Sequence, residues 1–436
     1  MKNQIYIETY GCQMNTYDSD LVQSILINHG FQMVDSPNQA SVALLNTCSI
    51  RENANNKVLN RVHEIKRVSS DIKIGILGCM ATNFKTELLD NKRLNIDLIA
   101  GPDSYQALPS LINDAIDAQI QEKPFDVTLS EFETYESIYP AQKDGANAWV
   151  AIMRGCNNFC TFCVVPYTRG RERSRSISSI LDEVKLLEDQ GFKQVTLLGQ
   201  NVNSYRFGND TFIDLLDQIS SKTSIKRIRF TSPHPKDFPI ELLQLINDRP
   251  NICKQIHVPL QSGNDRILKK MNRSYTQVEF LSLIDTIKST IPTVALSTDI
   301  IVGFPTETHD EFLDTKHVCE TVMFDHAFIF KYSERPNTRA ALKFPDDVSA
   351  DDKTERIMAL IEMQKSHSKI KNSQWVHQKQ DILIERIDDH QLVGRNDANV
   401  LVYCPKSNDL IQVGDLVPCM IQSATPHGLK ACVHQQ

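Results

Sequence analysis

The first hundred residues alternate short apolar runs with amphipathic stretches. The strand-like runs are QIYIETYGC, SVALLNTC, KIGILGCM and NIDLIAGP. Between them lie the helix-like stretches TYDSDLVQSILINHG, which is expected to end at Gly30, and RENANNKVLNRVHEIKRV. Alternation of this kind predicts a parallel sheet covered by helices. We therefore predict an open parallel-sheet α/β domain over residues 1–120, with a last helix at LPSLINDAIDAQI.

The alternation resumes from Ala148 to about Lys371. Its strand-like runs, separated by helix-like stretches, are VAIMRG, FKQVTLLG, IKRIRFTS, QIHVPL, VALSTDIIVG and HAFIFKYS. Six such units in order predict a partial (β/α)6 barrel over residues 148–371 rather than a doubly wound sheet. Residues 121–147 contain Pro124, Pro140 and an acidic run, and we predict that they form a linker.

The chain changes character at about Gln374. The remaining segment is strand-rich and lacks a helical period, as DILIERIDD and QLVGRNDANVLVYC show. This pattern predicts a small β-barrel over residues 374–436. Five basic residues oppose seven acidic residues there, so the segment differs from a strongly basic RNA binder.

Length and composition are those of an ordinary globular protein with two or three domains, at 436 residues, 41% hydrophobic and 23% charged. No run approaches 18 apolar residues and the N-terminus lacks a signal-peptide pattern, so we expect a cytoplasmic protein without membrane spans. Eleven cysteines in a reducing compartment favour metal binding or chemistry over disulfides.

The net charge of −7 argues against indiscriminate nucleic-acid binding. Basic residues nevertheless gather in three islands, at 169–175, 222–229 and 266–273. Such islands are able to meet phosphates, which favours an RNA-sized partner. The alternative for each island is a solvated surface.

Cys156, Cys160 and Cys163 form a C-x3-C-x2-C pattern just after an apolar run. Three thiolates at this spacing can each hold a different iron of one [4Fe–4S] cube and leave the fourth iron without a protein ligand. An open coordination position on a metal usually indicates chemistry rather than scaffolding. The alternatives are a zinc site or an inert cysteine group, but no His follows at the spacing that zinc sites use.

Three further cysteines, Cys12, Cys48 and Cys79, each lie at the carboxyl end of one of the first three predicted strands. Ligands bind at that edge of open α/β sheets, so residues far apart in sequence can converge there. We predict a second cluster on these cysteines. The alternative is that they are small buried core residues, as free Cys often is.

The C-x3-C-x2-C loop, with Phe162 before its last cysteine, resembles that of radical S-adenosyl-L-methionine enzymes. The wider string GCNNFCTFCVVPYTRGRE is similar to the MiaB-type tRNA methylthiotransferases, and TYGCQMN, NTCSIRENA and GCMA resemble the N-terminal motifs of that family. The resemblance covers nearly the whole chain and implies a radical-SAM barrel and a C-terminal TRAM-like domain. A local departure is Asn337, where family members commonly carry Gly after the Pro.

The resemblance implies a reaction and the roles of six cysteines. Cys156, Cys160 and Cys163 would hold the [4Fe–4S] cluster that cleaves S-adenosylmethionine to a 5′-deoxyadenosyl radical. Cys12, Cys48 and Cys79 would hold an auxiliary [4Fe–4S] cluster that carries the transferred sulfur. With two S-adenosylmethionine molecules, the family adds a methylthio group to C2 of N6-dimethylallyladenosine at tRNA position 37. The implied partners are tRNA, an electron donor and a sulfur source, and we expect a monomer.

Further candidates follow from motif matches at the ends of the predicted barrel strands. Phe162, Gln200, Asn201, Ser232, Gln261 and Asp299 are candidates for contact with S-adenosylmethionine, and Gly303 for close approach of backbone to its adenine. The alternative for the polar residues is a loop group satisfied by backbone. Arg169 and Arg171 suit RNA or the cofactor carboxylate. The remaining cysteines are expected to be ordinary buried thiols: Cys253, Cys319, Cys404, Cys419 and Cys432.

Two other functions fit parts of the same pattern. The first is a sister methylthiotransferase that acts on threonylcarbamoyladenosine in tRNA or on a ribosomal-protein aspartate. The second belongs to another class, a metal-stabilised RNA-binding protein without turnover. The polar, glycine-containing strand ends of the middle segment disfavour the second, because a structural metal site needs none of them.

Overall fold

The computed structural model describes residues 3–49, 52–117, 119–120, 122–142, 145–406 and 410–434. Contacts divide the chain into two compact units. The first unit comprises residues 1–143, 153–176 and 335–342, and the second comprises residues 144–152, 177–334 and 343–436. Both cysteine triplets singled out in the sequence therefore belong to the first unit. The predicted domain boundaries at residues 120, 147 and 371 stay predictions.

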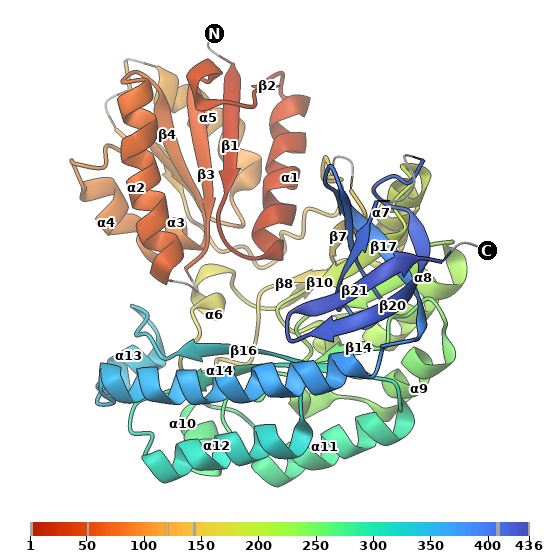
Figure 1. Cartoon of the computed structure of the whole chain (residues 1–436). Coiled ribbons are helices and arrows are strands. Elements are labelled where there is room, and N and C mark those ends of the chain that lie inside the picture. The colour runs from red at the N-terminus through yellow and green to blue at the C-terminus, as the bar shows by residue number, and fades with distance from the viewer. Residues whose placement is uncertain are drawn as a thin grey trace. The chain divides into compact units, whose positions relative to one another are not determined.

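The first unit contains an open sheet of parallel strands in the order β2-β1-β3-β4-β5-β6, as predicted. Figure 1 shows β1, β3 and β4 side by side between helices. The strands are β1 (Gln4–Thr9), β2 (Gln32–Met33), β3 (Val42–Thr47), β4 (Lys73–Gly78), β5 (Leu98–Ala100) and β6 (Phe125–Asp126). The sequence analysis missed β2 and β6, since two residues are too short a run to show a period.

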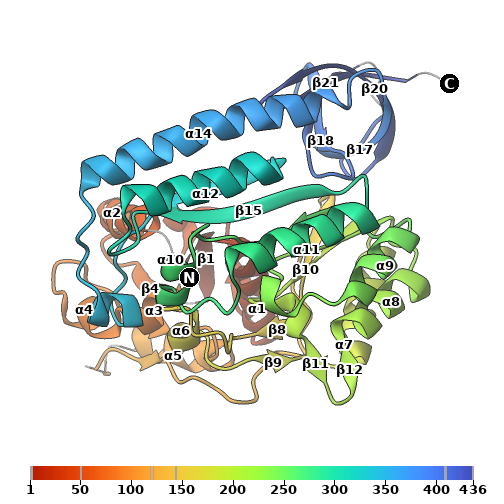
Figure 2. The same ribbon diagram turned by 90° about the horizontal axis from the view of Figure 1, so that it is seen from below.

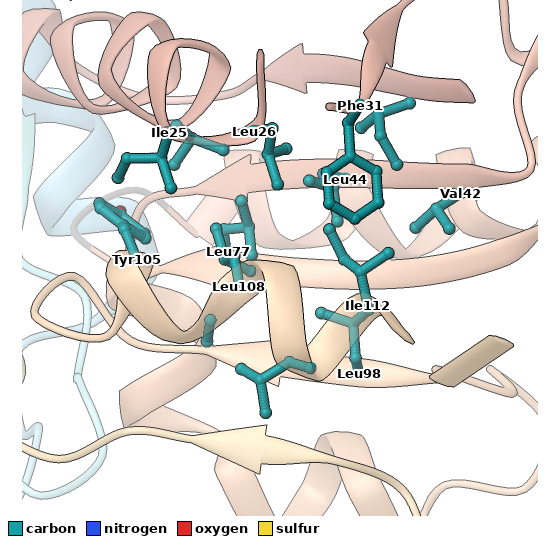
Figure 3. Close-up of a cluster of buried hydrophobic side chains, with 14 of the residues drawn as sticks. Ile25, Leu26, Phe31, Val42, Leu44, Leu77, Leu98, Tyr105, Leu108 and Ile112 are labelled. Atoms are coloured by element: carbon teal, nitrogen blue, oxygen red, sulfur yellow. The ribbon is translucent and has the colours of Figure 1, made fainter. Parts of the chain in front are cut away.

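Helices cover both faces of this sheet. One face packs against α1 (Gln13–Asn28) and α5 (Leu108–Ile116), and Figure 3 shows the resulting core around Leu44 and Leu77. The other face packs against α2 (Glu52–Val68), α3 (Cys79–Asn83) and α4 (Lys85–Asp90). Successive β3 residues alternate between the two cores, as the strand period of two requires.

The first unit also contains several short strands and helices. They are β8 (Met153–Arg154), α6 (Val165–Thr168), β9 (Arg173–Ser174) and α13 (Arg339–Lys343). β8 and β9 pair antiparallel, so they close the loop that carries Cys156, Cys160 and Cys163.

The second unit contains six parallel strands in sequence order, which confirms the predicted partial barrel. They are β7 (Asn147–Ala151), β10 (Gln194–Leu198), β13 (Arg227–Phe230), β14 (Gln255–His257), β15 (Ala295–Val302) and β16 (His326–Lys331). A parallel bridge between Ile228 and Ile252 joins the two three-stranded halves. The connecting elements are α7 (Ile177–Asp189), β11 (Arg206–Phe207), β12 (Asp210–Thr211), α8 (Phe212–Lys222), α9 (Ile240–Asp248), α10 (Asp265–Lys270), α11 (Gln277–Thr290) and α12 (His309–Val322).

A long helix, α14 (Ala350–Ser373), was not among the predicted elements. Figure 2 shows it lying alongside α12 and β15. Its buried side chains are mostly polar: Gln364 donates to the Phe324 carbonyl at 2.9 Å, and Ser368 donates to the Asp325 carbonyl at 2.8 Å. A helix that buries polar groups lacks the apolar period by which sequence analysis recognises helices.

The C-terminal strands close into a five-stranded barrel, as predicted. Their order is β17 (Lys379–Ile387), β18 (Gln391–Arg395), β19 (Leu401–Pro405), β21 (Gly428–Val433) and β20 (Leu416–Thr425). The barrel core is apolar and includes Cys404 and Cys419. Within the described residues, no helix of the chain is both long enough and apolar enough to cross a membrane.

Two arginines of the basic island at 222–229 do not face solvent but hydrogen-bond to the backbone of the C-terminal barrel segment. Arg227 donates to the carbonyls of Arg395 at 2.8 Å and Asp381 at 2.6 Å, and Arg229 donates to the carbonyl of Asn396 at 2.9 Å. Both arginines are buried. The interpretation of these two residues as phosphate contacts or solvated surface is therefore wrong.

Candidate iron–sulfur and cofactor site

Cys12, Cys48 and Cys79 lie at one edge of the first sheet. Cys12 caps the N-terminus of α1 just after β1, Cys48 follows β3 directly, and Cys79 begins α3 directly after β4. β1, β3 and β4 are neighbours, so their carboxyl ends bring the three cysteines to the same region. Cys48 and Cys79 are buried, and Cys12 is half-buried.

Two glycines allow these cysteine loops to approach one another. Gly11 has a φ of 137°, and a Cβ added there would lie 2.6 Å from the Cβ of Cys48. Gly78 has a φ of 84°, and its added Cβ would lie 2.5 Å from Oδ1 of Asn46. Only glycine fits both the positive φ and the close contact, which accounts for a glycine before Cys12 and another before Cys79.

Asn15 and Asn46 hold the first two cysteine loops together. The Asn15 Nδ2 donates to Oδ1 of Asn46 and to the carbonyl of Thr47, both at 3.1 Å. The Asn46 Nδ2 donates back to the carbonyl of Asn15 at 2.9 Å. Both amides are fully buried. The sequence analysis missed this pair, although each cysteine motif, TYGCQMN and NTC, carries one of the two asparagines.

The local environment favours the thiolate form of Cys12. A hydrogen bond with Cys48 lowers the pKa of Cys12 to about 6; burial opposes this shift, and the positive charge of Arg169 adds to it. The thiolate is the form of Cys that binds metals. A lowered pKa of Cys12 is thus compatible with metal binding.

Cys156, Cys160 and Cys163 lie on the loop between β8 and α6. The loop is fixed by backbone: the Cys156 N–H donates to the Gly170 carbonyl at 3.1 Å, and the Cys163 N–H donates to the Cys160 carbonyl at 3.0 Å. Cys156 and Cys160 are buried, while Cys163 and the candidate Phe162 are half-buried. The three thiols thus lie on a short loop that backbone hydrogen bonds hold in place, in the same compact unit as the first triplet.

A buried ionic network links the two cysteine regions. Asp18 on α1 accepts a hydrogen bond from Arg154 Nη2 at 2.7 Å and another from Arg169 Nη2 at 2.8 Å. Arg169 also donates through Nε to the sulfur of Cys79 at 3.2 Å. Burial raises the pKa of the Asp18 carboxyl, but the two guanidinium groups outweigh this effect and lower it overall. Asp18 is therefore a carboxylate held between two cations.

The sequence analysis missed Asp18 and Arg154, because partners 136 residues apart leave no local signal. It placed Arg169 against RNA or the cofactor carboxylate, whereas the structure buries this side chain against Asp18 and Cys79. Arg171 is exposed, with its guanidinium 4.7 Å from the ring centroid of Phe159. Only this second arginine keeps a surface position.

The donor set fits an anionic iron–sulfur cube. Arg154 Nε and Nη1 and Arg169 Nη1 are buried and have no hydrogen-bond partner among the described residues. In that same part of the chain, no three His, Cys, Asp or Glu side chains surround a point as one metal ion requires. In a cube each thiolate binds its own iron, and cluster sulfurs accept hydrogen bonds from nearby donors. Arg169, which contacts the sulfur of Cys79, retains a donor that is unpaired within the described residues and suits this chemistry.

The predicted cofactor contacts lie at strand ends of the second unit. Oε1 of Gln200 and Oδ1 of Asn201, just after β10, are buried acceptors with no partner among the described residues. Ser232 and Gln261 have φ angles of 57° and 64°, in the left-handed region that non-glycine residues seldom adopt. Oδ2 of Asp299 lies 3.2 Å from Nε2 of His257. Unpartnered acceptors suit the amino and hydroxyl donors of S-adenosylmethionine.

Gly303 has another explanation than contact with adenine. Its φ is 69°, and a Cβ added there would collide with the side chain of Lys353 from α14. Its N–H donates to Oε2 of Glu307 at 2.6 Å, and Glu307 in turn pairs with Arg356. Packing against α14 is therefore sufficient to require glycine here, and the contact with adenine stays a prediction.

Comparisons with known proteins give family matches for two segments of the chain. Residues 150–319 match the Radical SAM superfamily, and residues 4–101 match the family described as Uncharacterized protein family UPF0004. A protein of Phocaeicola vulgatus, called tRNA-2-methylthio-N(6)-dimethylallyladenosine synthase, is 42% identical over 98% of this chain and 95% of its own. A protein of the same name from Chloroherpeton thalassium is 44% identical over 97% of this chain and 94% of its own.

The chain belongs to the MiaB-type tRNA methylthiotransferases of the radical S-adenosylmethionine superfamily. The enzyme's fold also resembles that of TsrM from Kitasatospora setae, a radical S-adenosylmethionine methyltransferase, with a TM-score of 0.61 over 79% of this chain and 78% of the other. The cobalamin-dependent radical enzyme OxsB gives a TM-score of 0.53 over 82% of this chain and 56% of the other. At 15% and 12% identity, these two similarities concern the fold alone.

Proposed function

We propose that the enzyme adds a methylthio group to C2 of N6-dimethylallyladenosine at position 37 of tRNA, with two [4Fe–4S] clusters and two S-adenosylmethionine molecules. The observation that carries the proposal is the hydrogen bond from Arg169 to Cys79, because it joins the loop of one cysteine triplet to the other triplet within one unit. The names of relatives more than 40% identical along nearly the full length support the choice of substrate.

Each group of residues has a place in this proposal. Cys156, Cys160 and Cys163 would hold the radical cluster, and Cys12, Cys48 and Cys79 would hold the auxiliary cluster. When bound, the clusters and S-adenosylmethionine supply the radical chemistry and the transferred sulfur. The chain's own contribution is position and shielding: Asp18 fixes both arginines, and four of the six cysteines are buried away from water, namely Cys48, Cys79, Cys156 and Cys160.

The target base must reach the site away from its stacking neighbours. Enzymes that modify a nucleobase act on unpaired substrate or flip the base out. Position 37 lies in a single-stranded loop, and unpaired bases are the usual targets of sequence-specific RNA recognition. We further propose that the enzyme works as a cytoplasmic monomer, with a separate electron donor and sulfur source.

Two measurements test the proposal. Anaerobic reconstitution should give about eight irons per chain, falling to about four when Cys156, Cys160 and Cys163 are all changed to Ala. A count of about four falling to none would remove the auxiliary cluster and the sulfur-transfer chemistry. Zinc without iron would instead support a metal-stabilised RNA-binding protein.

The substrate is tested in cells by nucleoside profiling of bulk tRNA from a strain that lacks this enzyme. We expect methylthio-dimethylallyladenosine to disappear and dimethylallyladenosine to accumulate, with recovery when the parent chain is restored. Unchanged methylthio-dimethylallyladenosine together with loss of methylthio-threonylcarbamoyladenosine would assign the enzyme to the sister tRNA reaction. Unchanged tRNA would direct attention to a protein substrate.

A further inference from the structure

Arg169 makes two contacts of different kinds with one guanidinium group. Its Nη2 lies 2.8 Å from Oδ2 of Asp18, and its Nε lies 3.2 Å from the sulfur of Cys79. Arg169 is 3% exposed as a residue, and Asp18 is fully buried. Because the guanidinium is planar and its donors have fixed directions, the bond to Asp18 also sets the direction in which Nε points.

The charges around this guanidinium do not balance within the described residues. Arg154 and Arg169 share the single carboxylate of Asp18, while the neighbouring carboxylate of Asp103 is bound by Arg173 at 2.8 Å. The charge of Arg154 is partly stabilised by a cation–π contact with Tyr135, whose ring centroid lies 4.6 Å from the guanidinium carbon. Buried charge is costly unless it is paired. The excess positive charge therefore favours an anionic group at Cys79.

We propose that Arg169, oriented by Asp18, raises the reduction potential of the cluster held at Cys79. The inference rests on the proposed function, since it requires Cys79 to be a cluster ligand. One-electron reduction adds a negative charge to the cube, and a hydrogen-bonded cation stabilises that charge more than it stabilises the oxidised form. Hydrogen bonds to cluster sulfurs and local charge are established determinants of cluster potential.

The position of Arg169 along the chain gives the contact a second consequence. Arg169 lies six residues after Cys163, and Arg154, the other partner of Asp18, lies two residues before Cys156. Asp18 thus holds both flanks of the loop that carries the second triplet, at 2.7 Å and 2.8 Å. The residue that contacts Cys79 is fixed by the same carboxylate that seats this loop, so the two cysteine regions share one electrostatic anchor.

The test uses the full chain in which Cys156, Cys160 and Cys163 are changed to Ala, so that any cluster present is the auxiliary one. In this background Arg169→Gln removes the charge and the Nε donor, Arg169→Lys keeps the charge but not the planar fork, and Arg171→Gln is the control from the same loop. A redox titration followed by electron paramagnetic resonance gives the potential of each. We expect Arg169→Gln to weaken reduction about tenfold, which is about 59 mV for a one-electron couple.

We expect Arg169→Lys to fall between the parent and the Gln variant, and Arg171→Gln to leave the potential unchanged. Pulsed resonance on protein labelled with 15N-arginine adds a readout that folding alone does not move: a nitrogen coupling to the reduced cluster that Arg169→Lys abolishes. If Arg169→Gln does not retain iron, the Lys variant and this coupling decide the question. An unshifted Lys potential with no nitrogen coupling in the parent overturns the proposal, whereas absence of iron from the background chain overturns the proposed function instead.

Discussion

Cys79 in the first unit and Cys253 in the second are equally buried, at 3% and 2% exposure, yet their sulfurs meet opposite surroundings. The sulfur of Cys79 accepts a hydrogen bond from Arg169, a cation fixed by Asp18. Burial raises the pKa of Cys253 to about 12; the charges of Arg229 and Arg227 oppose this shift, while Asp397 adds to it through its charge and a hydrogen bond. Burial alone therefore does not distinguish these two thiols, whereas the direct hydrogen bond from Arg169 does.

Cys319 resembles Cys253 in its burial and pKa, whereas a hydrogen bond with Cys419 lowers the pKa of Cys404. Burial also raises the pKa of Cys319 to about 12. Cys404 and Cys419 belong to the apolar core of the C-terminal barrel, and Cys432 is half-buried. The prediction of buried thiols is confirmed for Cys253, Cys319, Cys404 and Cys419, and wrong for Cys432. The second unit uses cysteine as a small apolar residue.

The largest expected effect comes from exchanging each of the two compared thiols for alanine. Cys79→Ala should remove the auxiliary cluster, about four of about eight irons, and abolish methylthiolation, because a cube held by two thiolates is poorly retained. Cys253→Ala should keep all the iron and the activity at a cost of about 1 kcal/mol in the free energy of unfolding. Iron and sulfide analysis with a tRNA assay measures both. Iron loss in Cys253→Ala would abolish the distinction drawn between the two thiols.

The contrast also depends on charge, so the next variant removes the buried carboxylate. Asp18→Asn leaves two buried guanidinium groups without their counterion and should lower the free energy of unfolding by about 3–5 kcal/mol. The matched control is Asp217→Asn in the second unit, where Asp217 pairs with Arg249 and both side chains are half-exposed. That pair should contribute about 0–1 kcal/mol. Urea unfolding of both variants measures the difference, and equal losses would contradict the role given to burial.

The sequence predicted the fold better than the site's electrostatics, for a physical reason. The strands that end before Cys48 and Cys79 are continuous apolar runs bounded by glycine and polar residues, which is a local signal. Arg169 and Asp18 are 151 residues apart in the sequence, and their ion pair forms only when the chain folds. Asn15 and Asn46 are intermediate, since each belongs to a recognisable cysteine motif but their bond spans 31 residues. The spacing of residues within one motif could be predicted from the sequence, whereas the hydrogen bonds between motifs could not.

The absence of a local signal also explains α14 and the basic islands. The buried face of α14 carries Gln364 and Ser368, which bond to backbone carbonyls, so a polar stripe replaces the apolar stripe that marks a helix. Arg227 and Arg229 were read as surface charges because composition does not show which carbonyls a guanidinium will meet. In each case a polar side chain is satisfied by distant backbone.

The smallest expected effect tests whether the second unit tolerates a buried charge at a strand end, as the first unit does at Asp18 on α1. His234, two residues after Ser232, lies buried with its Nδ1 accepting the Lys236 N–H at 3.2 Å. Burial lowers the pKa of His234 to about 3, and the charges of Arg273 and Lys236 lower it further. Its usual value is about 6.5, so the unfolded chain binds the proton more tightly than the folded chain. The contribution to stability is full above pH 6.5 and is lost as the pH falls from there toward 3.

Between pH 6.5 and 5.5 this histidine should cost the parent chain about 1 kcal/mol in the free energy of unfolding. His234→Asn offers an acceptor to Lys236 without a titrating ring, so its stability should change less over the same interval. Urea unfolding of both chains at pH 7.5, 6.5 and 5.5 isolates the difference. A parent and a variant that lose stability in parallel would show that a counterion reaches His234. Both units would then pair their buried charges, and the difference between them would be limited to the surroundings of their cysteines.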